Sequence, residues 1–235
     1  EARTIAKLDH PNIVPVHDAG IEDGVPWMAM RLVQGDSLDA TLKKGGALDA
    51  RRAAGLLIQA AKALDHAHRK GIVHRDVKPS NMLIERREDG AEHLWLADFG
   101  IARILSGRTT SSEAGLAGTP AYMSPEQISG KRVDARADIF AWGCVAYELI
   151  TGKRAFRGES YSEIMYKLVH ESPEGFAELG ERAGKPFESV VKKALSKSSE
   201  DRFQTAEEMM HALEAVTKTN GAESHRTLRL PWPGL

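Results

Sequence analysis

The most constraining feature of this 235-residue chain is an apolar segment at residues 139–150. The segment is shorter than the roughly 18 residues that a helix needs to cross a bilayer, and it contains Glu148. Other parts of the chain must therefore cover it. We expect a buried central helix from Asp134 to Ile150, ended by Gly152, in which Cys144 packs as a small hydrophobic residue.

The hydrophobic pattern on either side predicts the elements that cover this helix. Two apolar runs at 13–19 and 25–33, separated by turn residues, predict an antiparallel hairpin, and two short strands are expected at 82–84 and 93–97. A short helix is expected at 37–43. A stronger helix begins at Asp49, because apolar residues recur on one face at Ala53, Leu56, Leu57, Ala60, Ala61 and Leu64. Further helices are expected near 160–170, 187–195 and 204–216, and strands followed by helices indicate an α+β fold.

The charge balance restricts the class of partner. Lys and Arg number 32 and Asp and Glu 33, so the formal net charge is -1, which argues against nucleic acid or an anionic membrane surface as the main partner. The single cysteine allows neither an intrachain disulfide nor a zinc cluster, and no signal peptide opens the chain. We therefore expect a reducing compartment and a cytoplasmic location.

The two ends of the sequence carry expectations of their own. The chain begins with Glu1 rather than methionine, inside residues that we expect to form the end of a helix, so we expect a fragment whose N-terminus lies elsewhere. Residues 217–235 show no clear pattern and predict a linker or a disordered tail. No membrane segment is expected within these residues, a membrane anchor outside them stays open, and so does the oligomeric state.

The loop at residues 74–81 brings a carboxylate, an ammonium group and an amide within six residues, at Asp76, Lys78 and Asn81. In phosphoryl transfer to an alcohol, Asp76 can orient the hydroxyl and accept its proton, and Lys78 can stabilise charge on the phosphoryl oxygens. The Asn81 carbonyl is a hard ligand for Mg²⁺, and Asp98 can supply a second one. Asp76 alone would more simply cap a turn, but its coincidence with the other three residues favours the catalytic interpretation.

The order of five motifs resembles the catalytic domain of eukaryotic-like serine/threonine protein kinases, in a bacterial style. They are the catalytic loop His74-Arg75-Asp76 with Asn81, the metal-binding motif Asp98-Phe99-Gly100, the substrate-docking segment 118–122 with Ser124-Pro125-Glu126, the helix start at 138–143, and Asp201-Arg202-Phe203. Ser124 departs from the alanine that is usual in the family. Lys78 is similar to the Ser/Thr branch rather than to tyrosine kinases.

The resemblance implies a two-lobed α+β kinase fold. Residues 1–33 would be a remnant of the small N-lobe, and residues 34–216 the mostly helical C-lobe. The implied activity is transfer of the ATP γ-phosphoryl, with Mg²⁺, to Ser or Thr residues of protein substrates, regulated through an activation loop at 106–118. Two alternatives stay open: a non-catalytic pseudokinase that acts as a scaffold, and a small-molecule phosphotransferase of similar fold. The Pro-Glu segment and Arg202 favour a protein substrate.

By the same resemblance, residues from both lobes would hold the nucleotide. Glu1 corresponds to the glutamate of helix C and Met30 to the gatekeeper. The hinge would be Arg31 to Val33, which binds adenine through main-chain atoms, so the unusual basic residue at its start does not argue against binding. Either Asp36 or Ser37 would contact the ribose. Lys78 would contact the transferred phosphate, and Asn81 and Asp98 would bind Mg²⁺.

Regulatory and structural roles are also implied. Arg75, with Arg103 as a second donor, would hold a phosphate on the activation loop, and Thr119 would hydrogen-bond Asp76. The candidate phosphoacceptors are Thr109, Thr110, Ser111 and Ser112. Asp138 would hydrogen-bond the catalytic-loop backbone, and Arg202 would pair with Glu126. His74 would support the loop, whereas ordinary surface or helix positions are expected for His10, His17, His66, His68, His170 and His211.

Two parts of the kinase pattern are missing. No Gly-x-Gly-x-x-Gly occurs in these residues, and no lysine precedes Glu1. The segment Thr4-Ile5-Ala6-Lys7 superficially resembles the strand-lysine motif, but it follows Glu1 in the same helix and does not qualify. We therefore expect the isolated 235 residues to be inactive or nearly so.

Overall fold

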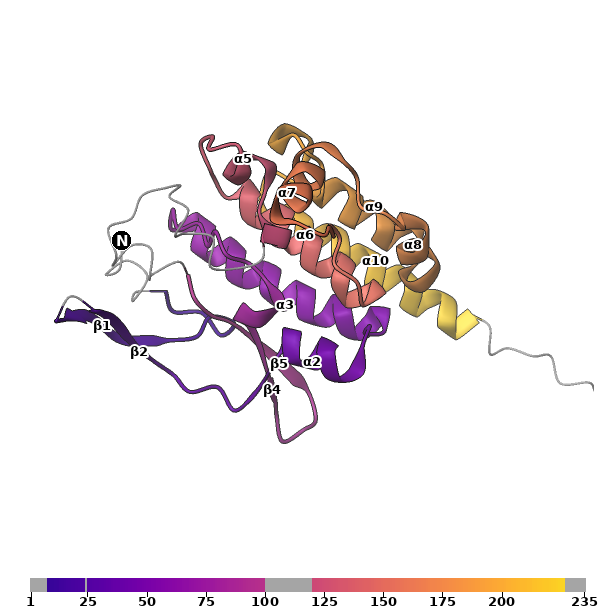
Figure 1. Cartoon of the computed structure of the whole chain (residues 1–235). Helices are drawn as coiled ribbons and strands as arrows, with labels where there is room; N and C mark the ends of the chain where they lie inside the picture. The colour runs from indigo at the N-terminus through magenta and orange to yellow at the C-terminus, as the bar shows by residue number, and fades with distance from the viewer. Residues whose placement is uncertain (1–7, 24, 100–119, 227–235) are drawn as a thin grey trace, which may run out of the picture.

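The computed structural model describes residues 8–23, 25–99 and 120–226 (Figure 1). A ribbon of two strands, β1 (Val16–Glu22) and β2 (Val25–Met30), extends away from a body of helices. The two strands pair antiparallel, with Glu22 opposite Val25, which confirms the predicted hairpin.

A second sheet lies beside the helices and has the strand order β3-β4-β5. Its strands are β3 (Gly35–Ser37), β4 (Met82–Arg86) and β5 (Glu92–Leu96), all antiparallel to their neighbours. Strands β4 and β5 confirm the short strands expected at 82–84 and 93–97, and their apolar residues pack into the core. Strand β3 was not expected, because Gly35 and Asp36 indicated a break. It forms by pairing with Glu85 and Ile84 rather than through a hydrophobic pattern of its own.

Two long helices form the centre of the body. Helix α3 (Ala50–Arg69) begins after Asp49, whose carboxylate accepts a hydrogen bond from the Arg52 N–H at 2.9 Å. Helix α6 (Arg136–Thr151) is buried on nearly all sides and ends at Gly152, which adopts the left-handed conformation at φ 71°. The Trp142 indole of α6 donates to the Leu57 carbonyl of α3 at 3.1 Å, which joins the two helices. The predicted central helix is confirmed.

The remaining helices surround this pair. They are α2 (Leu38–Gly45), α5 (Pro125–Ile128), α7 (Tyr161–His170), α8 (Phe176–Ala183), α9 (Lys185–Ala194) and α10 (Ala206–Arg226), with short 3-10 turns at Pro79–Asn81, Pro120–Tyr122 and Ser199–Asp201. The helices expected near 160, 187 and 204 are present. Helix α8 was not anticipated, and α10 extends ten residues past Val216, into the segment that was expected to be a linker or disordered.

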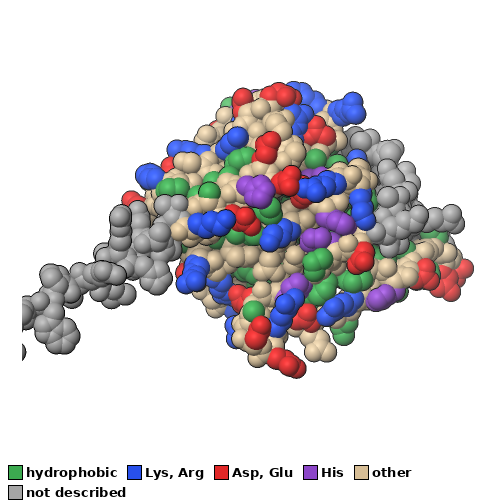
Figure 2. Space-filling view, turned by 180° about the vertical axis from the view of Figure 1, so that it is seen from behind, with side chains coloured by type: hydrophobic (Ala, Val, Ile, Leu, Met, Phe, Trp, Pro, Cys, Tyr) green, Lys and Arg blue, Asp and Glu red, His purple; other side chains and the backbone are tan. Residues whose placement is uncertain are grey.

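The surface of the body mixes both signs of charge. Figure 2 shows basic and acidic side chains interspersed over the face seen from behind, without one continuous basic area. Within the described residues, no helix is both long and apolar enough to span a bilayer. The central α6 is buried by its neighbours, as the apolar pattern required.

Candidate active site

Three of the four predicted catalytic side chains converge in the loop between α3 and β4. The Asp76 carboxylate oxygen Oδ2 accepts from Lys78 Nζ at 2.7 Å and from Asn81 Nδ2 at 3.1 Å. Asn81 Nδ2 also donates to the Asp76 carbonyl at 2.8 Å. The 3-10 turn that begins at Pro79 produces this arrangement, because it brings Asn81 back over Asp76.

The fourth residue, Asp98, lies at the same end of the β4–β5 hairpin as Asn81. Asn81 immediately precedes β4 and Ala97 follows β5, and the Ala97 N–H donates to the Asn81 carbonyl at 2.9 Å. Asp98 itself is exposed and adopts a left-handed backbone at φ 60°. Non-glycine residues in this region are strained and are often found at functional sites. Phe99, by contrast, is buried.

The backbone of the loop is held by Asp138 at the start of α6. Its carboxylate accepts from the His74 N–H and the Arg75 N–H, both at 2.7 Å, so the contact implied by the kinase resemblance is present. His68 Nε2 lies 2.8 Å from the same carboxylate. Burial would raise the pKa of Asp138, but the His68 hydrogen bond and the other nearby donors hold that pKa below its usual value.

His74 supports the loop from inside the core. It is fully buried, which lowers the pKa of its imidazole and keeps the ring neutral. Nε2 donates to the Ala97 carbonyl at 2.9 Å, and Nδ1 accepts the Asp76 N–H at 3.2 Å. The ring also lies against Phe99, with centroids 4.5 Å apart. These contacts connect the two motif segments and leave no N–H of the ring free for proton transfer.

Next to Asp98, residues 13–16 and β2 line a small apolar pocket. It is lined by Ile13, Val14, Val16, Met28, Met30, Asp98 and Phe99. The expected gatekeeper, Met30, therefore lies beside the metal-binding candidate. The Arg31 N–H is engaged by the Pro15 carbonyl at 2.9 Å, so an adenine contact at this residue would use its carbonyl. Ser37 caps α2 by accepting the Ala40 N–H at 3.1 Å.

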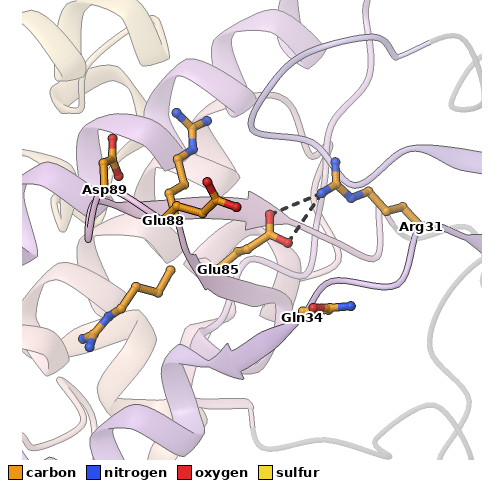
Figure 3. Close-up of a pocket in the computed structure, with 7 residues that line it drawn as sticks. Arg31, Gln34, Glu85, Glu88 and Asp89 are labelled. Carbon is orange, nitrogen blue, oxygen red and sulfur yellow. Dashed lines mark hydrogen bonds and ion pairs between the residues drawn. The ribbon is translucent and has the colours of Figure 1, made fainter.

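The Arg31 side chain points toward Glu85 of β4 (Figure 3). Its Nη2 lies 3.3 Å from Glu85 Oε2, and its guanidinium carbon lies 4.4 Å from the centre of the Trp95 ring. The Trp95 indole donates to the same Glu85 oxygen at 2.9 Å. The indole hydrogen bond, with the guanidinium charge, lowers the pKa of Glu85. The expected hinge is thus attached to the three-stranded sheet.

A second motif pair meets at the base of α5. Arg202 is fully buried and binds Glu126 through two hydrogen bonds of 2.7 and 2.8 Å. Its remaining N–H groups donate to the carbonyls of Ser196, Arg136 and Lys197. Burial would raise the pKa of Glu126, but the guanidinium outweighs burial and keeps that pKa below its usual value.

Several predicted residues lie outside the described part of the chain. These are Glu1, Arg103, Thr109, Thr110, Ser111, Ser112 and Thr119. The activation-loop interpretation of residues 106–118 lies outside it as well. Arg75 is described, and its side chain is exposed to solvent.

Comparison with known proteins agrees with this geometry. The family model described as the protein kinase domain matches residues 1–213. The chain belongs to the protein kinase domain family. The expected serine/threonine kinase resemblance is confirmed by similar curated relatives. A probable serine/threonine-protein kinase from Corynebacterium efficiens is 40% identical over 93% of this chain and 34% of its own length. The serine/threonine-protein kinase PknB of Mycobacterium tuberculosis is 37% identical over 97% of this chain and 37% of its own length. This kinase domain therefore spans about a third of those relatives.

A solved structure supports the fold of the kinase domain. The crystal structure of Rad53 in complex with AMP-PNP matches with a TM-score of 0.74 and 26% identity, over 89% of this chain and 52% of that one. The protein-kinase-like α+β fold is confirmed.

Sequence reasoning missed two contacts of the kinase domain. His68 was expected to be an ordinary helix residue, yet it is largely buried against Asp138. The available signal was its place four residues after Leu64 and seven after Ala61, on the buried face of α3. The partners of Arg31 could not be inferred, because Glu85 and Trp95 are more than fifty residues away along the chain.

Proposed function

We propose that the protein containing this kinase domain transfers the γ-phosphoryl group of ATP to Ser or Thr hydroxyls of proteins. The observation that carries the proposal is the Asp76 carboxylate, which lies within 3.1 Å of both an ammonium group and an amide, on a loop whose backbone Asp138 holds. Relatives named serine/threonine-protein kinases support the same chemistry.

In this proposal Asp76 orients the acceptor hydroxyl and takes its proton as the phosphoryl group departs from ATP. The carboxylate is half exposed and can therefore be reached by a substrate. The Lys78 ammonium group forms an ion pair with the Asp76 carboxylate in this structure. During transfer it stabilises the negative charge on the phosphoryl oxygens. Asp138 holds the backbone of the loop that carries Asp76 and Lys78, through the N–H groups just before Asp76.

The residues present fit a nucleotide with Mg²⁺. The side-chain NH₂ of Asn81 donates to Asp76, so its side-chain carbonyl oxygen can bind a cation. The exposed Asp98 adds a carboxylate ligand. Bound Mg²⁺ would neutralise phosphate charge. The adenine would lie against the apolar side chains that line the pocket at Met30, main-chain groups of Arg31 and Val33 would contact it, and Asp36 or Ser37 would contact the ribose.

Regulation is proposed to act through the activation loop. Arg75 carries an exposed guanidinium beside Asp76, and a phosphate bound there would be held close to the catalytic residue. Phosphorylation at one of residues 109–112 would supply that phosphate.

The test is a phosphotransfer assay on the product of the complete reading frame that contains these residues, with ATP, Mg²⁺ and a generic protein acceptor. Asp76→Asn removes the proton acceptor and keeps the shape, so we expect kcat to fall by at least about 10²-fold. Binding of ATP should change little. Asp89→Asn, in the exposed turn between β4 and β5, is the matched control and should retain activity.

Phosphoserine or phosphothreonine in the acceptor, absent with Asp76→Asn, would support the proposal. A wild-type protein that binds ATP without transferring phosphate would favour the pseudokinase alternative. Turnover of Asp76→Asn close to wild type would exclude the assigned role.

A further inference from the structure

Gln127 in helix α5 forms a contact that the motif pattern does not contain. Its Oε1 accepts from the Ser124 N–H at 2.9 Å and from the Ser124 hydroxyl at 3.1 Å. Its Nε2 donates to the Arg75 carbonyl at 3.0 Å. The orientation of the amide is determined by its surroundings, because two donors lie on one side and a carbonyl lies on the other.

The group that Gln127 holds is the peptide bond between Arg75 and Asp76. The carbonyl of this peptide accepts from Gln127, and its N–H, that of Asp76, donates to His74 Nδ1 at 3.2 Å. Both ends of one peptide plane are therefore fixed by side chains. The direction of the Asp76 side chain follows from that plane, since its Cα is the next atom of the same rigid unit.

The contact acts at a strained position. Arg75 has φ 66°, in the left-handed region that residues with a side chain rarely adopt. Such a conformation persists only where surrounding groups hold it. Asp138 grips the N–H groups of His74 and Arg75, on the N-terminal side of the strained residue. Gln127 supplies the restraint on the C-terminal side, from a different helix.

We propose that Gln127 is a positioning residue, which holds the Arg75–Asp76 peptide in the plane that directs the Asp76 carboxylate toward the acceptor hydroxyl. This inference rests on the phosphoryl transfer proposed above. Helix α5 follows directly after the Pro120–Tyr122 turn, the part of the expected substrate-docking segment that the structure describes. Gln127 therefore also joins the segment expected to receive the substrate to the loop that acts on it.

The decisive variant is Gln127→Glu in the complete protein. The glutamate keeps the acceptor for Ser124 and the size of the side chain, but it loses the N–H donor and places an oxygen opposite the Arg75 carbonyl. We expect kcat to fall about tenfold, because small errors in the placement of a catalytic group are costly. The KM for ATP should stay within about twofold, because the residue lies away from the nucleotide pocket.

Gln204→Glu is the matched control. Gln204 Nε2 also donates to backbone carbonyls, those of Ser199, Glu200 and Arg202, but it touches no part of the 74–81 loop. If Gln127 only stabilised the fold, Gln127→Glu and Gln204→Glu would both lower the melting temperature, and neither would change kcat. Gln127→Met, which removes the amide without adding charge, should reproduce the loss of kcat.

Amide hydrogen exchange gives a readout that does not depend on turnover. Exchange in residues 74–78 should be faster in Gln127→Glu and unchanged in Gln204→Glu. Wild-type phosphotransfer together with a Gln127→Glu kcat within twofold of wild type would overturn this inference alone. A loss confined to the KM for ATP would also overturn it. A wild-type protein without phosphotransfer would overturn the proposed function as well.

Discussion

Arg202 and Glu126 are 76 residues apart in the chain and form a two-pronged ion pair, with N–O distances of 2.7 and 2.8 Å. The guanidinium is fully buried and the carboxylate nearly so, at 0% and 12% side-chain exposure. The pair connects helix α5 to the segment before α10. Because both side chains are removed from solvent, each charge is stabilised mainly by the opposite charge of its partner.

Removal of the arginine should therefore be costly. Arg202→Met leaves the Glu126 carboxylate buried without its partner, and we expect a loss of about 3–5 kcal/mol in the free energy of unfolding. Urea denaturation measures this. Lys153→Met is the control, because the Lys153–Glu178 pair is partly exposed at the surface and such pairs contribute at most about 1 kcal/mol. Equal losses in the two variants would contradict the structural role of the buried pair.

Acid should weaken the same pair. The pKa of Glu126 in the folded protein lies below the usual value of 4.5, so the unfolded chain binds more protons between those two values. Its contribution to stability is present above about pH 4.5 and is lost as the pH falls through the folded-state pKa. Unfolding midpoints of wild type and Glu126→Gln between pH 3 and 7 should converge on acidification. A constant difference across that range would contradict this.

Lys197 should produce a trend of the same sign at alkaline pH. Its ammonium lies 4.1 Å from the centre of the Phe156 ring and donates to the Leu168 carbonyl at the end of α7 at 2.6 Å. Burial lowers the pKa of Lys197 to about 8, from an ordinary 10.5. Between these values the unfolded chain binds more protons, so this group makes the free energy of unfolding rise with pH from about 8 to 10.5.

Lys197→Met should remove that rise in a denaturation series across pH 7.5–10.5. Lys193→Met is the control, because Lys193 also lies over an aromatic ring, Phe203 at 4.5 Å, but on the exposed surface. A Lys197→Met protein with the same alkaline pH dependence as wild type would exclude the assignment.

Gly35 is required by the close approach of β3 to β4. A Cβ at this position would lie 1.9 Å from the Ile84 carbonyl oxygen, which is backbone and cannot move aside. We expect Gly35→Ala to destabilise the protein by about 1–3 kcal/mol through overpacking. Gly55→Ala, in the open middle of α3, should instead stabilise it by about 0.5–1 kcal/mol. Midpoints of chemical denaturation that moved in the same direction would contradict this pair of expectations.

The sequence predicted the elements whose residues carry a strong pattern of their own. Helix α6 is apolar on all sides and α3 on one face, and both lie where the pattern indicated. Asp76, Lys78 and Asn81 could be grouped because they stand within six residues of one another. For that reason the sequence alone predicts that these three side chains lie together.

Elements that depend on distant partners could not be found in this way. Strand β3 exists through pairing with Ile84 and Glu85, and α8 lies between glycines that resemble loop residues. Helix α10 continues beyond Val216 because a helix that packing has already nucleated extends at little cost through polar residues. The contact from Gln127 to Arg75 joins residues 52 apart, and no spacing rule indicates it.

The attachment of Arg31 to the three-stranded sheet has a consequence for how the joint between the two sheets responds to solution. Its ion pair with Glu85 is partly exposed and is weakened by dissolved salt, whereas its stacking on the buried Trp95 ring is shielded from it. The ion pair therefore weakens as ionic strength rises, whereas the stacking on Trp95 persists. The rigidity of the contact between the two sheets consequently depends on the salt concentration as well as on the fold.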